Sequence, residues 1–296
     1  MNIFLDNVNL DSTSGPNHFA SKLKKYMELQ GDSFNPSEQY DVQLSFIQKT
    51  QTRAPLFQRL DGIYFNSAQD YNSLNAEIKN TYHQSKGVIF QSEFNKNLTF
   101  EYFGEHENYE VIHNGADLEF ISQVQPINNS ILDSFDDVWC CASSWRPHKR
   151  LSSNISYFLQ NSGKNDCLVV AGWPPKDEVI ADKRILYIGD VDIRMLYGIY
   201  KKSKYFVHLA YLDHCPNVVV DAVACGCHII CSSAGGTKEV AVNGTIIDEG
   251  EWDFAPLKLY EPPEMNFDNR RENISSTNID MKYVASRYHN FLRGSK

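Results

Sequence analysis

The sequence predicts an α/β protein of two domains, each organised around a parallel β-sheet. Short apolar runs of strand length alternate with amphipathic segments of helix length over residues 1–122, and the alternation starts again at residue 138. Residues 123–137 lack apolar periodicity and carry Pro126 among Asn, Ser and Asp residues, as a linker does. A chain of 296 residues is long enough for two such domains. We therefore expect an N-terminal domain over residues 1–122, a linker over 123–137 and a C-terminal domain over 138–279.

The N-terminal domain is expected to begin with a strand over residues 3–5, a polar loop over 6–17 and a helix. Gly15 lies in the loop, and apolar residues follow at helical spacing as far as Gly31. A strand, a glycine loop and a helix can bind phosphate through free backbone N–H groups, although an ordinary βα turn has the same pattern. Further strands are expected at residues 41–47, within 60–66, at 87–92 and at 109–113, with helices around 74–82 and 94–103.

The C-terminal domain is expected to repeat this alternation. Strands are predicted at residues 138–143, 167–171, 185–188, 205–210, 228–233 and, as the last one, 245–248, with helices at 151–161, 193–203 and 218–224. Residues 260–277 are polar and contain proline, and an amphipathic helix over 280–294 closes the chain.

Composition narrows the class of function. Hydrophobic residues make up 42% and charged residues 22% of the chain, as in soluble globular proteins. The net charge of −9 argues against a general nucleic-acid binder, which normally carries a basic stripe. The first residues have no cationic start and no long apolar run, and no stretch approaches 18 apolar residues, so we expect a cytoplasmic protein without a transmembrane segment. Composition does not predict the oligomeric state.

Seven cysteines raise the question of a metal site. All of them lie from Cys140 onward, and a group near the C-terminal half of the chain includes Cys225, Cys227, His228 and Cys231. Their spacing matches no zinc pattern, and their side chains are expected to point in different directions from the helix and the strand. We interpret the cysteines as small buried residues and expect no bound metal.

Residues 205–239 form the stretch around which the rest of the chain is organised. A strand, a helix and a strand in that order make a βαβ unit, whose helix N-terminus suits a phosphate. Asp213 precedes the helix and Asp221 lies inside it, with seven residues between them. Because this spacing corresponds to about two helical turns, both carboxylates are expected on one face of the unit. There they can accept hydrogen bonds from ligand hydroxyls. The alternative is a helix cap and a solvated surface carboxylate.

A second candidate site is the basic segment over residues 143–151. Arg146, His148, Lys149 and Arg150 follow a predicted strand within five residues, in an otherwise acidic protein. Arginine and lysine can neutralise a diphosphate and the charge that grows on it when a bond to it breaks. A solvated basic turn is the alternative.

Several of these stretches together resemble a known signature. They are Asp213-x7-Asp221, residues 216–220, Ala224-Cys225-Gly226 and Ala234-Gly235-Gly236-Thr237-x-Glu239. This set resembles that of retaining, nucleotide-sugar-dependent glycosyltransferases of the GT-B fold, the glycogen synthase and mannosyltransferase-like group (glycosyl transferases group 1). The resemblance implies two Rossmann-like α/β domains facing across a crevice. The family usually has Glu-x7-Glu, so both acids here are one methylene shorter.

The resemblance implies a role for each donor-site residue. Asp213 would contact the donor sugar, Asp221 the ribose, and the backbone around Asn217, Val218, Gly235 and Gly236 would meet sugar and phosphate. Lys149 would grip the diphosphate together with Arg146 or Arg150, an assignment that stays open. The remaining donor-site residues are expected to be Trp145, the loop glycine Gly15 near the phosphate, and Gly172 and Val191 beside the nucleoside.

Further assignments concern the acceptor side and a motif that resembles a metal site. The resemblance places Asp61 where the family could contact its acceptor. An aspartate that forms the turn before Gly62 explains this residue equally well. Glu239 could lie near the sugar, or could be a first-turn carboxylate favoured by the helix dipole. Asp190-Val191-Asp192 spells a metal-binding DxD, which the resemblance places beside the base instead. It also implies that Asn114-Gly115-x-Asp117 ends the first domain and that the last helix crosses back onto it.

The expected function is retaining transfer of a sugar, of hexosyl type, without a metal or other cofactor. The donor would be a UDP-, GDP- or ADP-sugar, and the acceptor a carbohydrate, a lipid or another hydroxyl compound. One alternative is a catalytically weak or inactive module that binds nucleotide sugars. Another is an epimerase or phosphorylase on the same fold, although no marker of a pyridoxal lysine is visible.

Overall fold

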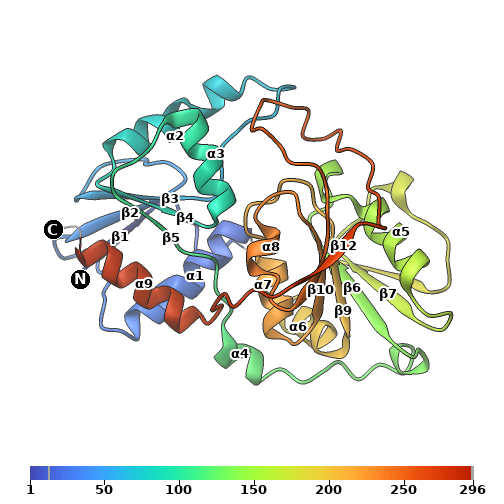
Figure 1. Ribbon diagram of the computed structural model, residues 1–296. Coiled ribbons are helices and arrows are strands. Elements are labelled where there is room, and N and C mark those ends of the chain that lie inside the picture. Colours follow the sequence, from blue (N-terminus) through green and yellow to red (C-terminus); the bar gives the residue numbers. More distant parts are fainter. Residues whose placement is uncertain (13, 295–296) are drawn as a thin grey trace.

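The computed structural model describes residues 1–12 and 14–294, so Thr13 of the predicted loop lies outside the described residues. Figure 1 shows two α/β units side by side. The N-terminal sheet has the order β1-β2-β3-β4-β5, with all neighbours parallel. Its strands are β1 (Ile3–Asp6), β2 (Val42–Phe46), β3 (Leu56–Leu60), β4 (Gly87–Phe90) and β5 (Tyr109–Val111).

The C-terminal sheet has the order β12-β11-β10-β9-β6-β7-β8. All neighbours are parallel except β12, which runs antiparallel to β11. The strands are β6 (Val138–Ala142), β7 (Cys167–Ala171), β8 (Ile185–Gly189), β9 (Tyr205–His208), β10 (His228–Ser232), β11 (Gly244–Ile247) and β12 (Arg270–Asn273). The predicted α/β class with parallel sheets is confirmed.

Helices cover the sheets, and all of those described except the short α4 and α8, which were not predicted, lie close to the predicted positions. They are α1 (Gly15–Glu28), α2 (Tyr71–Gln84), α3 (Glu93–Phe103), α4 (Leu118–Ser122), α5 (Leu151–Asn161), α6 (Ile193–Lys202), α7 (Asn217–Ala224), α8 (Thr237–Val240) and α9 (Met281–Gly294). Several begin at a side-chain cap, in which an Asp or Ser oxygen accepts a backbone N–H: Asp70 for α2, Ser92 for α3 and Asp192 for α6. No helix within the described ranges is long and apolar enough to cross a bilayer.

Two predicted elements are corrected by the structure. The strand expected within residues 60–66 is β3, which ends at Leu60. Gln58 and Arg59 in its middle break the apolar pattern, yet both are buried because their polar groups find partners in the core. The strand at residues 245–248 is not the last, because β12 follows within the polar stretch 260–277. β12 is largely exposed at the sheet edge, so no apolar pattern marks it.

In each sheet there is a point at which the chain stops adding strands on one side and continues on the other side, which we call the reversal point. From β6 the chain proceeds outward to β7 and β8 and then returns to the other side of β6 with β9. In the N-terminal unit, β1 has β2 on one side and a single parallel bridge from Asn2 to Ser33 on the other. Ligands of open α/β sheets bind at the carboxyl ends of the strands beside such points.

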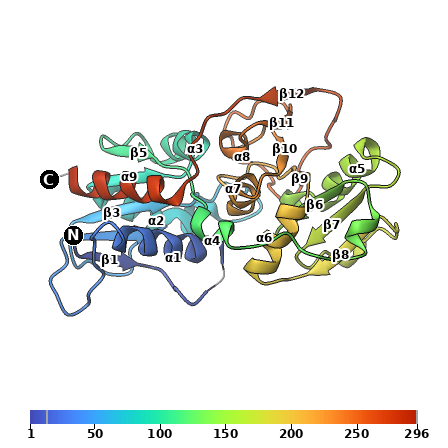
Figure 2. The ribbon, with the colours of Figure 1, turned by 90° about the horizontal axis from the view of Figure 1, so that it is seen from below.

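The buried Arg59 side chain connects the parts of the N-terminal unit. Its guanidinium pairs with Asp61, donates to Tyr288 of α9 (3.0 Å) and donates to Asn114 (2.7 Å). The Asn114 amide in turn donates to the Cys215 carbonyl of the C-terminal unit at 2.9 Å. Helix α9 therefore belongs to the N-terminal core, packed on α1 in Figure 2, and the same network reaches the second unit.

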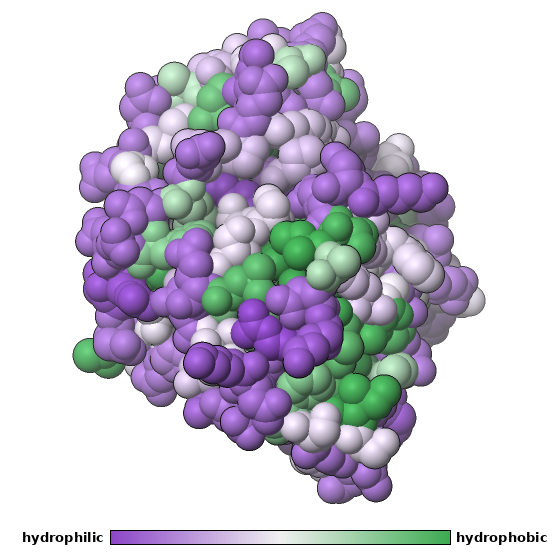
Figure 3. Space-filling view, turned by 90° about the vertical axis from the view of Figure 1, so that its right-hand side faces the viewer, coloured by the Kyte–Doolittle hydropathy of each residue, from purple (hydrophilic) through white to green (hydrophobic). Residues whose placement is uncertain are grey.

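The end face of the C-terminal unit carries apolar surface. Figure 3 shows it at the end of the molecule formed by α5, β7 and the edge strand β8. Exposed apolar side chains between β7 and β8 include Val179 and Ile180.

We expect Arg59→Met to lower the free energy of unfolding by about 3–5 kcal/mol, because it leaves the buried Asp61 carboxylate without its cation. Urea denaturation measures this, with Arg53→Met, a change at an exposed arginine, as the control that should stay within about 0.5 kcal/mol. Equal stability of the two variants would contradict the role of Arg59.

Candidate active site

The carboxyl ends of β6 and β9 meet at the reversal point of the C-terminal sheet. Lys149 follows β6 and Asp213 follows β9, and the Lys149 ammonium lies 2.5 Å from an Asp213 carboxylate oxygen. The same oxygen is 2.9 Å from Nε2 of His208, at the end of β9. The structure thus brings together two predicted site residues that are 64 positions apart in the chain.

The electrostatics of this cluster keep Asp213 ionised. Burial acts to raise the pKa of Asp213, but the Lys149 charge and the hydrogen bond from His208 together hold it well below its usual value. Burial, reinforced by Lys149, lowers the pKa of His148 to about 4, and burial lowers the pKa of His214 to about 4. These imidazoles are therefore neutral near pH 7, and the cationic groups of the basic segment are its lysine and arginines.

The two arginines of the basic segment have different environments. Arg150 is 3% exposed, and its guanidinium donates to both carboxylate oxygens of Glu249 at 2.9 and 2.8 Å. It also donates to the Pro263 carbonyl at 2.8 Å. Its charge and donors are therefore committed within the fold, whereas Arg146 lies exposed at the start of the same turn.

Two helix N-termini meet beside this cluster. Helix α7 begins at Asn217 and α1 at Gly15, and no side chain caps either helix. The Asn217 amide donates to the Gly15 carbonyl at 2.9 Å, so the two predicted residues touch across the units. The positive ends of two helix dipoles at one place favour an anion.

Asp213 and Asp221 do not lie on one face of a helix, which corrects the expectation drawn from their spacing. Helical geometry applies only from Asn217 onward, and Asp213 lies in the loop before it. Asp221 is 4% exposed and lies 3.3 Å from the ammonium of Lys22 on α1. His18, one turn earlier on α1, has a lowered pKa because it is buried and faces Lys22. Sequence reasoning missed Lys22.

The glycines before α8 allow close packing of backbone. The Gly236 N–H donates to the Asp213 carbonyl at 2.7 Å, so this amide already has a partner. A side chain on Gly235, which has φ of +91°, would put Cβ 2.5 Å from the same carbonyl oxygen. Glycine at 235 and 236 therefore holds the loop after β10 against the loop after β9. Val218 follows Asn217 in the first turn of α7 and is half-buried.

Both predicted acceptor-side acids are engaged in contacts between or within the units. Glu239 accepts the backbone N–H groups of Glu93 (2.7 Å) and Phe94 (3.0 Å) at the start of α3, and contacts His113 at 2.9 Å. It thus caps a helix of the other unit. Asp61 is paired with Arg59, as described above.

The remaining predicted residues follow β6, β7 and β8. The Trp145 indole donates to the Ala171 carbonyl at 3.0 Å, and the Gly172 N–H donates to the Gly189 carbonyl at 2.8 Å. Val191 is half-buried and lies just before α6. Asp192 caps α6 by accepting the Met195 N–H at 2.8 Å, which gives the DxD motif a structural role. No group of three or more His, Cys, Asp or Glu residues that could hold a metal occurs among residues 1–12 and 14–294.

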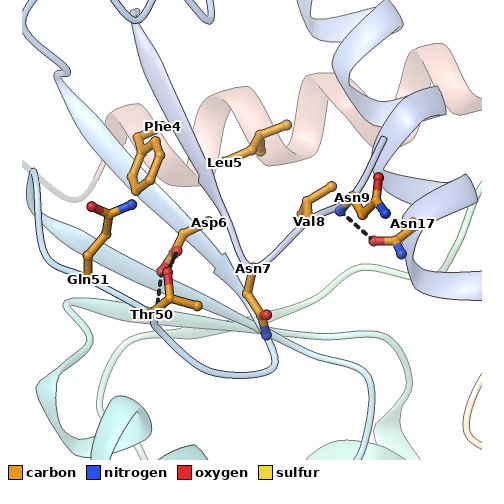
Figure 4. A pocket seen from close by; sticks show the side chains of 9 residues that line it. All are labelled: Phe4, Leu5, Asp6, Asn7, Val8, Asn9, Asn17, Thr50 and Gln51. Atoms are coloured by element: carbon orange, nitrogen blue, oxygen red, sulfur yellow. Dashed lines mark hydrogen bonds between the residues drawn. The ribbon is translucent and has the colours of Figure 1, made fainter. Parts of the chain in front are cut away.

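A cavity of about 480 Å³ lies at the reversal point of the N-terminal sheet. Figure 4 shows that its side chains come from the end of β1, the loop that follows, α1 and the segment after β2. Asp6 is hydrogen-bonded to Thr50, and the Asn17 side chain accepts the Asn9 N–H at 3.0 Å. The lining residues are Phe4, Leu5, Asp6, Asn7, Val8, Asn9, Asn17, Thr50 and Gln51. Sequence reasoning predicted only a polar loop here.

Comparison with known proteins agrees with this architecture. Residues 140–255 match the family model of glycosyl transferases group 1. The C-terminal unit is therefore similar to group 1 glycosyl transferases over these residues. The predicted resemblance is confirmed over these residues, which contain the Lys149–Asp213 pair and Asp221. No curated protein matches the chain.

Solved structures extend the likeness to the whole chain. Anabaena Alr3699/HepE in complex with UDP and glucose is 16% identical, with a TM-score of 0.70 over 99% of this chain and 100% of the other. The sucrose-phosphate synthase of Thermosynechococcus elongatus is 11% identical, with a TM-score of 0.68 over 99% of this chain and 97% of the other. The chain therefore has the GT-B glycosyltransferase fold, as predicted.

We expect the stabilising effect of Asp213 to depend on pH. Because its pKa is depressed in the folded state, its contribution is present above the ordinary carboxyl pKa of about 3.9 and is lost as the pH falls through that value towards the native pKa. The difference in free energy of unfolding between wild type and Asp213→Asn should be largest near about pH 7 and shrink below about pH 4. Urea titrations across this range measure it, with exposed Asp268→Asn as control. A difference independent of pH would exclude the proposed charge effect.

Proposed function

We propose that this protein transfers a sugar from a nucleoside diphosphate sugar to a hydroxyl acceptor, with retention of the anomeric configuration. The observation that carries the proposal is the anion site at the reversal point of the C-terminal sheet. There Lys149 pairs with Asp213, Arg146 lies exposed three residues before Lys149, and the uncapped helix α7 begins four residues after Asp213. Fold neighbours in complex with UDP and glucose, or with ADP and acarbose, support a nucleotide as part of the ligand.

In this proposal the cations act on the leaving diphosphate. Lys149 and Arg146 neutralise it in the ground state and stabilise the charge that develops on it as the glycosidic bond breaks. Arg150 is not assigned this role because Glu249 already neutralises it. The protein cations supply the positive charge, so we propose that the reaction is metal-independent. No protein nucleophile is invoked: the acceptor hydroxyl attacks on the face that the diphosphate leaves. Its oxygen bonds to the anomeric carbon as the bond to the diphosphate breaks, and its proton passes to the leaving diphosphate.

Asp213 is proposed to bind a hydroxyl group of the donor sugar. One of its oxygens is held by Lys149 and His208, and the other accepts the His214 N–H at 3.0 Å. A diphosphate that draws the Lys149 ammonium towards itself frees an acceptor position on Asp213. Binding of the phosphate and binding of the sugar are thereby coupled. The UDP-glucose complex of the Anabaena neighbour favours a hexosyl donor.

Asp221 is proposed to bind the ribose, which requires a change of partner. Its carboxylate now faces Lys22 of α1 and is almost fully buried. A ribose hydroxyl and the Lys22 ammonium therefore compete for the same carboxylate.

The acceptor is proposed to enter the cavity beside β1 and β2. Amide and hydroxyl side chains line it, and the one acidic lining residue, Asp6, already accepts hydrogen bonds from Gln43, Ser45 and Thr50. Neutral hydroxyl groups, such as those of a carbohydrate, match this lining better than an anion does. Asp61 and Glu239 are not assigned to the acceptor, because both have partners in the fold.

A binding module without turnover is the second candidate. It is favoured by the Lys22–Asp221 pair, because Lys22 occupies the carboxylate that would bind the ribose. It is also favoured by Asp213 and Asp221 being shorter than the glutamates usual in the family. Release of free sugar or transfer product from a donor separates the two functions, because a binding module would show affinity without product. The cytoplasmic location stays a prediction from the sequence.

We expect one of UDP, GDP and ADP to bind with micromolar affinity in isothermal titration calorimetry. Lys149→Ala should weaken binding by about 10-fold or more, since it removes a charge-assisted contact to phosphate. Lys258→Ala, at an exposed lysine paired with Glu261, is the control and should bind as wild type does. If none of the three nucleotides binds, the proposed function is wrong.

We expect Lys22→Met to bind the same nucleotide about 5-fold or more tightly than wild type, because the competitor for Asp221 is removed. Lys24→Met on the same helix, where Lys24 pairs with Glu28, is the matched control with unchanged affinity. Weaker binding by Lys22→Met would show instead that Lys22 contacts the donor directly.

A further inference from the structure

A second cavity lies where the two segments that connect the units run side by side. Its volume is about 300 Å³, at the lower end of the range for small-molecule sites. The chain leaves the N-terminal unit after β5 and returns to it between β12 and α9, as Figure 1 shows. The Ala116 N–H donates to the Ile279 carbonyl at 2.8 Å, and the Ala116 carbonyl accepts the Met281 N–H at 3.0 Å, which joins the two segments. Residues of both segments line the cavity, so a ligand there contacts both connections at once.

The lining of this cavity suits an anion. Its base is apolar, because Ile112 and Val284 are buried. Its polar lining residues are one arginine, one histidine, one asparagine and three residues with hydroxyl groups, and none of the described lining residues is an aspartate or a glutamate. The chain as a whole has a net charge of −9, so a cavity with this lining stands out from the rest of the surface. Its groups attract negative charge and offer hydrogen-bond donors.

Arg287 of α9 keeps part of its guanidinium available to a ligand. Its Nε donates to one oxygen of Glu110 at 2.8 Å, and its Nη2 donates to the same oxygen. Its Nη1 has no hydrogen-bond partner in the part of the chain that the structure describes. The side chain is 30% exposed, unlike that of the buried Arg150, and an ion pair at the surface contributes little free energy. An oxyanion can therefore bind at Nη1 while Glu110 holds the other edge of the guanidinium in place.

Three neutral donors border the same cavity. The Asn278 side-chain oxygen accepts the Asp280 N–H at 2.9 Å, which leaves the amide N–H groups of Asn278 for a ligand. The hydroxyl groups of Ser276 and Tyr283 have no hydrogen-bond partner among residues 1–12 and 14–294, and both residues are exposed. These groups can donate to a ligand oxygen without breaking a hydrogen bond within the fold.

We propose that this cavity binds a small phosphate-bearing compound, held by Arg287, Asn278 and the hydroxyl groups of Ser276 and Tyr283. A phosphate group has several strong acceptor oxygens around one atom, so it can take donors that arrive from several directions. A carboxylate has two oxygens in one plane and matches such a set less well. The inference does not depend on the proposed function, because these residues lie on the segments between the units and not at the strand ends that carry Lys149 and Asp213.

The test measures the binding of inorganic phosphate by calorimetry in Lys149→Ala protein, so that the cation of the candidate active site does not contribute. We expect this protein to bind phosphate and Arg287→Gln, added to it, to weaken binding by about 10-fold or more, because a charge-assisted contact is lost. Arg293→Gln, at an exposed arginine later in the same helix, is the matched control and should leave binding unchanged. If Lys149→Ala protein binds no phosphate, or binds it equally well with Arg287→Gln, the proposal is wrong.

A second variant and a second probe complete the test. Asn278→Ala combined with Tyr283→Phe changes only exposed positions, so it keeps the fold and should also weaken phosphate binding. Unchanged binding by this variant would overturn the assignment of the neutral donors, whatever the stability of Arg287→Gln in thermal unfolding. Acetate is the carboxylate probe and should bind more weakly than phosphate. Equal affinity for acetate would show that the cavity does not select a phosphate group.

Discussion

The buried Arg59 guanidinium is the constraint on which the arrangement of the two units depends. A charge inside a core must be neutralised and hydrogen-bonded, and Asp61, Tyr288 and Asn114 meet that demand from three separate parts of the chain. The requirement fixes α9 against β3 and holds Asn114 where it can donate to the Cys215 carbonyl. Cys215 lies two residues after Asp213, so the charge balance of the N-terminal core also positions the loop that carries the candidate active site.

The same principle governs the site itself, where ionised groups are paired in advance of any ligand. Lys149 holds Asp213, and Lys22 holds Asp221. Each pair avoids an isolated buried charge, and in the proposed function each makes ligand binding an exchange of partners. In the proposed function the phosphate competes for Lys149 and the ribose competes for Asp221, so the free energy of binding would be the difference between new and displaced contacts. Glu239, which caps α3 from the other unit, adds an interdomain contact that no ligand needs to replace.

The sequence predicted the alternation of strands and helices well, because strands of parallel sheets are buried on both faces and read as apolar runs. Helix α5 and strand β7 coincide with their predicted ranges. Strand β3 was misplaced because Gln58 and Arg59 are buried polar residues whose partners come from distant segments. Strand β12 was missed because it is an exposed edge strand.

The site was predicted as a set of residues but not as a geometry: the spacing of Asp213 and Asp221 implied one face, whereas the helix begins only at Asn217. The partners of Arg150, Asp61 and Glu239 depend on tertiary contacts that no local pattern encodes.

The shorter acid at position 213 has a consequence for the site as a whole. An aspartate carboxylate stays close to its own backbone, and here one oxygen accepts the N–H of the next residue, His214, at 3.0 Å. The other oxygen holds the Lys149 ammonium at the reversal point of the sheet. A longer side chain would carry the carboxylate, and with it the lysine, further from the strand ends. The aspartate therefore keeps the positive charge near the N-terminus of α7, where the proposed diphosphate would meet both the cation and the helix dipole.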